Sequence, residues 1–377
     1  MRPPAPSSPT TGATPDPYRA AGVDYDVLDA AKRAALTAAA ATSWLPLRRG
    51  ARLDDASRGE PATLVELGGV RLGFVLECLG TKSLLARAYE EATGADRFAA
   101  IGYDTVAAVV NDCCCVGALP VVVNAYFATG SASWYEGSRH ASLVDGFRRA
   151  CEDAGAAWGG GESPTLSGLV VEDGIDLAGS AIGVVPEGRP ALLGEALGPG
   201  DEIVLVASTG LHANGASLAR KVVAGLPDGL AHRLPSGEVL GEALLRPSPC
   251  YVGLVEALQE AGAGLHYASH VTGHGLRKLM RARRELAYRL HALPPVPEVL
   301  DFVAGRAGLD ARAAYATFNM GAGFALFVAG GEGGATVELA GRLGHEALVA
   351  GVAEAGERKV VLAPIGVEYA GDELELR

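Results

Sequence analysis

The segment 101–129 constrains the fold most, because polar residues interrupt a helix-then-strand pattern that is otherwise apolar. Apolar residues recur at three- and four-residue spacing from Val106 onward, which predicts a helix with one buried face. Asp104 and Asn111 project from nearly the same side of that helix, with Asp112 beside them. The chain must therefore fold so that this polar row finds partners.

Two interpretations of the polar row stay open. A carboxylate near the first turn, such as Asp104, can cap the helix and interact with the helix dipole. Asn111 and Asp112 fall in mid-helix, where both residue types are disfavoured and a buried charge needs a partner. A metal ion or a ligand donor is the usual partner of such groups.

The chain has 377 residues, which is long enough for two domains, each with its own core. The stretch Pro186–Gly200 is rich in proline and glycine and is the predicted boundary between domains 18–186 and 200–377. Residues 1–17 carry Pro, Ser and Thr without an apolar core, which predicts a disordered tail and no signal peptide. Both halves are expected to mix strands and helices in an α+β (α/β mixed) arrangement.

Charge and cysteine usage narrow the possible partners. The net charge of −12 argues against nucleic acid, because no basic surplus exists to neutralise phosphates. The basic run 277–284 is interpreted as a solvated helix face. The six cysteines include three in a row and no C-x-x-C pair, which indicates reduced, buried thiols. No apolar stretch is expected to reach the roughly 18 residues of a transmembrane helix, so a cytoplasmic protein with no membrane partner is predicted.

Regular elements are predicted from hydrophobic periodicity. The expected strands are 64–66, 70–76, 121–127, 175–185, 201–207, 324–329 and 360–364, and the expected helices are 18–41, 84–91, 140–154, 216–223, 276–284 and 337–343.

Polar turns adjoin several of these elements. The turn that ends in Gly80-Thr81-Lys82 suggests a phosphate loop but lacks the spaced glycines of a P-loop. The glycine run before Glu162 is either a tight turn or a close backbone approach to phosphate, with the carboxylate facing a metal. The turn 208–215 opens a helix, whose N-terminus offers free N–H groups to an anion. Its His212 is either a satisfied core histidine or a functional group. A second polar turn at 269–275, which also precedes a predicted helix, favours the functional interpretation.

Taken in order, these residues resemble one family, aminoimidazole ribonucleotide (AIR) synthetase, the phosphoribosylformylglycinamidine cyclo-ligases of purine synthesis. The similarity runs from about Tyr18 to the C-terminus. The matching segments are YRAAGVD (18–24), Gly80-Thr81-Lys82, IGYDTVAAVVND (101–112), YFATG (126–130), Gly160–Glu162, DLAGSAIGV (176–184), the turn 208–215, His270–Gly275 and TFNMGAG (317–323).

The resemblance implies a homodimer whose N-terminal sheets combine into a barrel, with a C-terminal α/β half over a cleft for ATP and a phosphoribosyl substrate. It also implies roles for individual residues. Magnesium would be held by Asp104, Asp112 and Glu162, and ATP by Glu77, Gly80, Thr81, Lys82, Asp104, Asn111 and Glu162. The catalytic groups would be His212, His270 and Lys82, and the substrate-binding residues Asn214, Thr272, Gly273, Gly275 and Asn319.

The chain departs from the family pattern in four places. Glu77-Cys78-Leu79 replaces Asp-Gly-Val, the run 163–167 lacks a second acidic residue, His274 replaces a glycine, and Leu45–Arg58 replaces a glycine-rich segment. Besides the cyclo-ligase itself, two alternatives are therefore considered. One is a diverged paralogue that activates another amide or amidine with ATP, and the other is a non-catalytic nucleotide-binding dimer.

Overall fold

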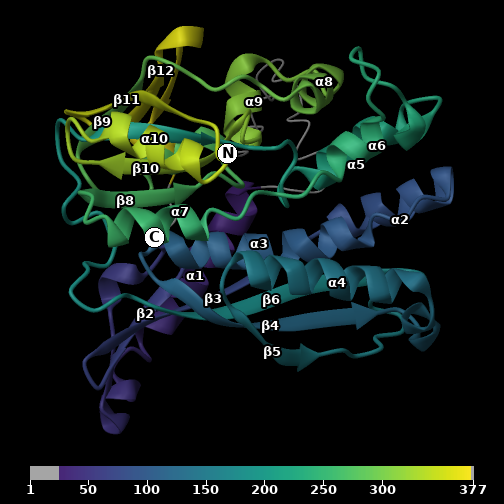
Figure 1. The fold of residues 1–377 in the computed structure, drawn as a ribbon, viewed down its shortest axis with the longest axis horizontal. Helices are drawn as coiled ribbons and strands as arrows, with labels where there is room; N and C mark the ends of the chain where they lie inside the picture. The colour runs from purple at the N-terminus through teal and green to yellow at the C-terminus, as the bar shows by residue number, and fades with distance from the viewer. Residues whose placement is uncertain (1–24, 375–377) are drawn as a thin grey trace, which may run out of the picture.

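The computed structural model describes residues 25–374, so the predicted tail at residues 1–17 lies outside the described residues. Figure 1 shows two sheets stacked one above the other with helices between and around them. All strands of the first sheet precede Pro186, and all strands of the second follow Gly200. The predicted mixed α+β fold with two parts is confirmed.

The first sheet has six strands in the order β1-β2-β3-β6-β4-β5. Neighbouring strands are antiparallel except β4 and β5, which are parallel. The strands are β1 (Ala51–Leu53), β2 (Thr63–Leu67), β3 (Val70–Cys78), β4 (Leu119–Thr129), β5 (Ala157–Glu162) and β6 (Ile175–Val184).

The second sheet has seven strands in the order β13-β12-β9-β11-β7-β10-β8. Here only β12 and β9 pair in parallel. The strands are β7 (Glu202–Ala207), β8 (Leu265–His270), β9 (Leu286–Leu290), β10 (Ala322–Val328), β11 (Ala347–Ala355), β12 (Lys359–Leu362) and β13 (Val367–Ala370).

Helices line both sheets. Those of the first half are α1 (Tyr25–Ala40), α2 (Lys82–Thr93), α3 (Phe98–Cys115) and α4 (Ser138–Asp153). Those of the second half are α5 (Ala216–Ala224), α6 (Leu240–Leu244), α7 (Val252–Glu260), α8 (Glu298–Arg306), α9 (Ala311–Thr317) and α10 (Gly333–Arg342). Short 3₁₀ turns are η2 (Leu45–Arg49), η3 (Asp55–Ser57), η4 (Ala132–Glu136), η5 (Gly229–Ala231), η6 (Gly275–Met280), η7 (Ala363–Ile365) and η8 (Gly371–Glu373).

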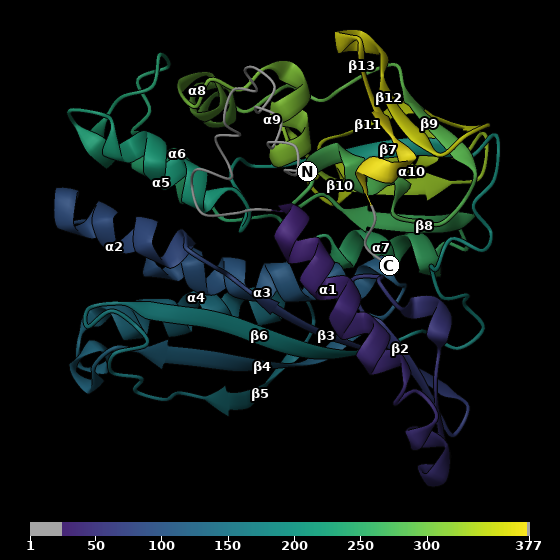
Figure 2. The same ribbon diagram turned by 180° about the vertical axis from the view of Figure 1, so that it is seen from behind.

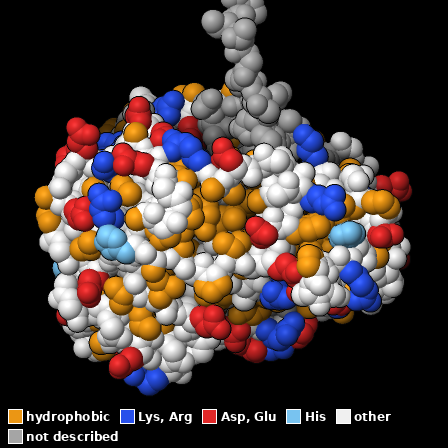
Figure 3. All heavy atoms as spheres, turned by 90° about the horizontal axis from the view of Figure 1, so that it is seen from above, with side chains coloured by type: hydrophobic (Ala, Val, Ile, Leu, Met, Phe, Trp, Pro, Cys, Tyr) orange, Lys and Arg blue, Asp and Glu red, His pale blue; other side chains and the backbone are white. Residues whose placement is uncertain are grey.

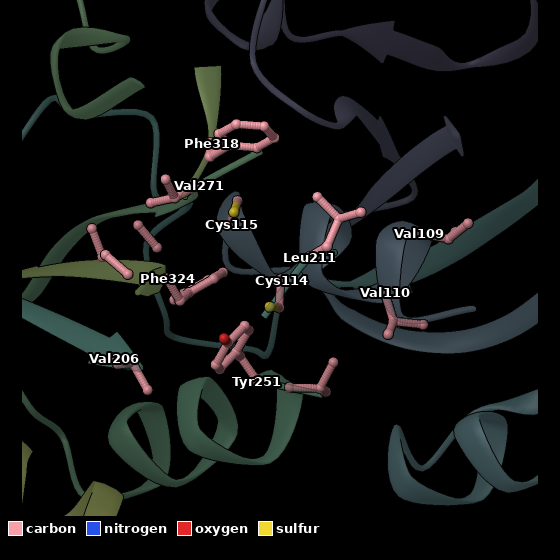
Figure 4. Packing of buried hydrophobic residues seen from close by; sticks show 14 of the residues in the cluster. Val109, Val110, Cys114, Cys115, Val206, Leu211, Tyr251, Val271, Phe318 and Phe324 are labelled. Atoms are coloured by element: carbon pink, nitrogen blue, oxygen red, sulfur yellow. The ribbon is translucent and has the colours of Figure 1, made fainter. Parts of the chain in front are cut away.

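Helix α3 is the centre of the molecule. It contacts β3, β4 and β6 on one side and β8 and α7 of the second half on the other. Figure 4 shows Cys114 and Cys115 of α3 among Tyr251, Val271 and Phe324 of the second half. By length and composition alone α3 could cross a membrane, contrary to the sequence analysis, yet 83% of it is buried inside the protein. Its apolar character is that of a core helix.

Two sequence interpretations of local structure are wrong. The glycine run before Glu162 forms the edge strand β5, which pairs with β4, and no tight turn. Gly161 is needed for this close pairing, because a Cβ there would lie 2.1 Å from the carbonyl oxygen of Ala125 on β4. The expected helix 276–284 is only the 3₁₀ turn η6, and its Lys278 is buried, so the basic run is no solvated helix face.

The six cysteine thiols are all free, as expected, but they are not all buried, because Cys78 is exposed and Cys250 is only half-buried.

The first helix bridges the two halves. Figure 2 shows α1 crossing in front of the boundary between the sheets. Its Asp29 accepts a hydrogen bond from Nε2 of His274 in the second half, at 3.2 Å.

On the face seen in Figure 3, Lys and Arg side chains are scattered among Asp and Glu and do not gather into one patch.

Candidate functional site

One cavity of about 270 Å³ lies between the halves and collects most of the predicted site residues. We call it the main cavity. The predicted residues that line it are Glu77, Gly80, Thr81, Asp104, Asp112, His212, Asn214, His270 and Thr272. Lys82, Asn111, Glu162, Gly273, Gly275 and Asn319 do not line it. A larger hollow of about 650 Å³, beside Tyr103, Cys250 and His345, includes none of the predicted residues.

Two helices begin at the wall of the main cavity. Helix α2 follows Gly80 and Thr81, and helix α5 follows Asn214 and Gly215. Neither N-terminus has a side-chain cap, so its first N–H groups are not satisfied by a capping side chain. The hydroxyl groups of Thr81 and Ser217 lie 2.9 Å apart and join the two helix starts. Uncapped N-termini attract anions, and phosphate groups above all.

Lys82 and Asp104 form a closed cluster beneath this wall. Lys82 Nζ lies 2.5 Å from Asp104 Oδ2, and both side chains are fully buried. The same amine donates to the carbonyl oxygen of Leu211 at 2.6 Å, and Asp104 Oδ1 accepts from the backbone N–H of Ser248 at 2.7 Å. Asp104 is not a helix cap, because α3 begins at Phe98. The cluster binds α2, α3 and the residue before His212 together.

Asn111 continues this attachment along α3. Its side-chain amide donates to the carbonyl oxygen of Pro249 at 2.9 Å and accepts from the N–H of Tyr251 at 2.8 Å. The polar groups of Asp104 and Asn111 thus find their partners in the segment 248–251. Sequence reasoning missed this segment, because no local pattern shows which distant backbone a buried amide will meet.

Asp112 faces the cavity and belongs to an open cluster with Glu77, His270 and Lys278. His270 Nδ1 lies 2.7 Å from Asp112 Oδ1. Burial disfavours the charged carboxylate, but the hydrogen bond and charge of His270, with Lys278 and Arg281, keep the pKa of Asp112 below its usual value. Asp112 is therefore ionised at neutral pH.

Glu77 lies beside Asp112 at the end of β3. Although the residue is reached by solvent, surrounding protein removes much of the water from its carboxyl group, and this raises the pKa to about 7. The nearby charge of Asp112 also raises the pKa of Glu77, whereas Lys278 and Arg281 lower it. Adjacent carboxyl groups that share a proton are suited to exchange it for a cation.

His212 is buried without a partner. Neither ring nitrogen has a hydrogen-bond partner among the described residues, so it is no satisfied core histidine. Burial, and then the nearby His270 and Lys82, hold its pKa well below the usual value, so the ring is neutral. Its centroid lies 6.2 Å from that of His270, whose Nε2 is also buried and unpartnered. Two imidazole edges are thus available to a ligand.

Comparison with known proteins agrees with this geometry. Residues 59–185 match the family model "AIR synthase related protein, N-terminal domain", and residues 198–363 match "AIR synthase related protein, C-terminal domain". The chain belongs to the AIR synthase related family.

Curated relatives in this family share a name. Phosphoribosylformylglycinamidine cyclo-ligase of Methanothermobacter thermautotrophicus is 34% identical over 83% of this chain and 87% of its own length. The enzyme of the same name from Anaeromyxobacter sp. is 38% identical over 74% of this chain and 79% of its own.

Solved structures share the fold at low identity. Thiamine-monophosphate kinase from Stenotrophomonas maltophilia has a TM-score of 0.58 and 22% identity, covering 81% of this chain and 90% of its own. AaThiL in complex with AMPPCP and TMP has a TM-score of 0.57 and 18% identity, covering 83% of this chain and 90% of its own.

Several AIR synthase motif residues have structural contacts here. Gly275 has φ +54°, and a Cβ there would lie 2.0 Å from the carbonyl oxygen of Tyr315. Asn319 accepts from Ser208 Oγ at 2.8 Å and donates to the carbonyl oxygen of Gly210 at 2.9 Å, which fixes the turn that leads to His212. Glu162 is exposed on the edge strand β5.

His274, which by the family resemblance stands where a glycine is usual, does not fill the main cavity. It keeps a left-handed backbone with φ 73° and points to Asp29 of α1. Leu28 and Lys32 of the same helix line the cavity. The substitution therefore attaches α1 beside the cavity.

Lys278 was missed as a site residue. Its Nζ donates to Thr272 Oγ1, which lines the cavity. The available signal was its position six residues after Thr272 and three residues beyond the motif His270–Gly275.

Proposed function

We propose that the protein is an ATP-dependent cyclo-ligase that converts formylglycinamidine ribonucleotide to aminoimidazole ribonucleotide, with release of ADP and phosphate. The observation that carries this proposal is the main cavity, where two uncapped helix N-termini lie with a carboxylate pair and two histidines that have unpartnered ring nitrogens. The shared name of the curated relatives supports the substrate. The AMPPCP in the AaThiL structure supports a nucleotide in this fold. A cytoplasmic enzyme of purine synthesis follows from this assignment.

Magnesium fits the residues present. No group of three or more His, Cys, Asp and Glu able to hold a metal occurs among the described residues. Magnesium, however, commonly takes one or two carboxylates and completes its shell with water and phosphate oxygens. Glu77 and Asp112 supply such a pair, whereas Asp104 is occupied by Lys82 and Glu162 is exposed at a sheet edge. When bound, the ion would spread the negative charge of the transferred phosphoryl group.

The chain supplies positioning and proton transfer for this reaction. The starts of α2 and α5 would bind phosphate oxygens, so that the formamide oxygen of the substrate bonds to the terminal phosphorus while the bond to ADP breaks and ADP leaves. A nitrogen of the same substrate then attacks the activated carbon, and phosphate leaves. His212 is neutral and unpartnered, so it can accept the proton that the attacking nitrogen loses. Asp112 accepts the bond from His270 Nδ1 and thereby fixes that ring. Asn214 and Thr272 line the same space for the substrate.

Phosphate release tests the proposal. Purified protein with ATP, magnesium and formylglycinamidine ribonucleotide should release phosphate, whereas omission of the ribonucleotide should reduce release to background. His212→Asn should lower kcat by roughly 10²- to 10⁴-fold, and His232→Asn, at a histidine that is stacked on Phe302 and does not line the cavity, should not. Absence of substrate-dependent release would remove the assignment. Complementation of a purine auxotroph then separates the cyclo-ligase from a paralogue with another substrate.

A homodimer is proposed as well. Alternate residues of the first sheet expose large apolar side chains on the face away from α3, among them Phe74 at 50% and Leu76 at 67%. Ile182 on the neighbouring strand β6 and Val121 on β4 are exposed too. A second copy of the sheet would cover this surface. Light scattering should give twice the chain mass, and Leu76→Asp should give a monomer.

A further inference from the structure

Lys278 is a buried cation behind the wall of the main cavity. Only 8% of the residue is exposed, and its Nζ is held by the hydroxyl group of Thr272. The backbone of η6 is fixed in turn, because Ser269 Oγ donates to the carbonyl oxygen of Lys278 at 3.2 Å. A lysine is rarely buried unless nearby charges compensate for the lost water.

The compensating charges are the carboxyl groups of the open cluster. Burial and the neighbouring Arg281 lower the pKa of Lys278 to about 8, while Asp112 and Glu77 act in the opposite direction. Lys278 in turn lowers the pKa of both carboxyl groups. The geometry agrees with this interaction, because Lys278 contacts Thr272, which lines the same cavity as Glu77 and Asp112 and thus places the amine one layer behind the cavity wall.

Lys32 lines the cavity but is exposed and lies 3.6 Å from Asp29, and the buried or half-buried cations near the cavity other than Lys278 are committed elsewhere. Lys82 is bound by Asp104 and Leu211. Arg281 donates to the carbonyl oxygen of Gly59 at 2.9 Å and lies 4.0 Å from Glu60. Lys278 is thus the buried cation whose main charge partners are the groups suited to hold a metal.

A fixed positive charge has opposite effects on two kinds of ligand. A free divalent ion on Glu77 and Asp112 is repelled by Lys278, with which it competes for the same negative charge. A divalent ion bound to a triphosphate brings a net negative charge, which Lys278 attracts. We propose that Lys278 makes the carboxylate pair of Glu77 and Asp112 select a divalent metal that arrives bound to phosphate over the free ion. This inference rests on the proposed function and makes Lys278 a positioning residue of that site.

Binding of Mn²⁺ tests the inference without turnover. Electron paramagnetic resonance can measure the affinity for Mn²⁺ alone and for Mn²⁺ with AMPPCP. In Lys278→Met we expect the affinity for Mn²⁺ alone to rise about tenfold and the affinity for Mn²⁺–AMPPCP to fall about tenfold. Lys278→Gln provides a second neutral variant if the first folds poorly. Lys278→Arg keeps the charge and should resemble the wild type.

A matched control is Lys221→Met, which removes a lysine on α5 that lies at another surface groove. It should leave both affinities unchanged. A merely structural lysine would move the two affinities in the same direction or leave both unchanged. Any pattern other than opposite changes in the neutral variants overturns the inference. Because no substrate is turned over, failure of the cyclo-ligase assay would leave this result interpretable, and the two failures are distinguishable.

Discussion

Helix α3 carries two acid–lysine contacts with opposite surroundings. Asp104 also lines the main cavity, but its carboxylate meets Lys82 where both side chains have no exposed surface, and Leu211 and Ser248 supply further protein partners. Asp112 meets Lys278 only through space, beside a cavity and a second carboxyl group. The same pair of residue types is thus structural where protein supplies every partner and functional where a place is left for a ligand.

The largest expected effect would come from Lys82. Lys82→Met leaves Asp104 as an uncompensated buried charge, so we expect the free energy of unfolding to fall by about 3–5 kcal/mol. Chemical denaturation measures this, with Lys278→Met as the comparison at the other contact. The latter should lose much less, because solvent and Arg281 remain near its carboxylates. If Lys82→Met is as stable as the wild type yet no longer binds nucleotide, Lys82 belongs with the ligand groups.

The next effect concerns Asp112. Asp112→Asn removes a proposed metal ligand and should weaken Mn²⁺–AMPPCP binding at least by the roughly 10- to 100-fold that loss of an outer metal partner costs. Circular dichroism should show an unchanged fold. Asp145→Asn, on the exposed surface of α4, serves as the control. Normal metal–nucleotide binding by Asp112→Asn would place this residue with the structural groups as well.

Asn111 should behave like the closed contact, although the sequence analysis assigned it to ATP. Asn111→Ala leaves the carbonyl oxygen of Pro249 and the N–H of Tyr251 without their partner, which costs about 2 kcal/mol of stability. Thermal unfolding measures that loss. Affinity for Mn²⁺–AMPPCP should stay near that of the wild type, and a selective loss of affinity would return Asn111 to the ligand site.

The smallest effect is a pH dependence at Glu77. The folded pKa of about 7 exceeds the ordinary 4.5, so the folded state binds this proton more tightly than the unfolded state. The associated stability is present below pH 4.5 and is lost as the pH rises to about 7. Relative to the wild type, Glu77→Gln should therefore gain stability across this window, by under about 1 kcal/mol because the group is reached by solvent. Equal pH profiles for the two proteins would contradict the shared proton.

Local pattern predicted α3, its polar row and the turns that meet at the cavity. Those features depend on residues close together in sequence, such as the spacing around Val106 or the turn before His212. Local pattern does not identify the distant hydrogen-bond partners of the polar residues on α3. Asp104 and Asn111 could not be assigned to protein contacts, because Ser248 and its neighbours lie more than a hundred residues away.

The prediction that Lys278 lies on a solvated helix face was wrong for a different reason. A basic run after Gly275 was interpreted with helical geometry, in which several of its side chains would face solvent. The chain instead forms a short 3₁₀ turn, whose side chains repeat every three residues. This turn directs Lys278 inward, and charge alone in a sequence does not show that direction. Glu162 is the converse case, because the sequence analysis placed its carboxylate at a metal, whereas in the structure it is exposed on the edge strand β5.

The attachment of Asp104 and Asn111 to residues 248–251 also limits how the protein can move. Three hydrogen bonds connect α3, the core of the first half, to the segment that precedes α7 in the second. A hinge motion that separates the two halves would therefore have to break buried hydrogen bonds. Helix α1, by contrast, contributes Leu28 and Lys32 to the cavity wall and is attached there through the hydrogen bond between Asp29 and His274. In hydrogen exchange we expect the amides of α1 to open far more often than those of α3 and α7, which should open together.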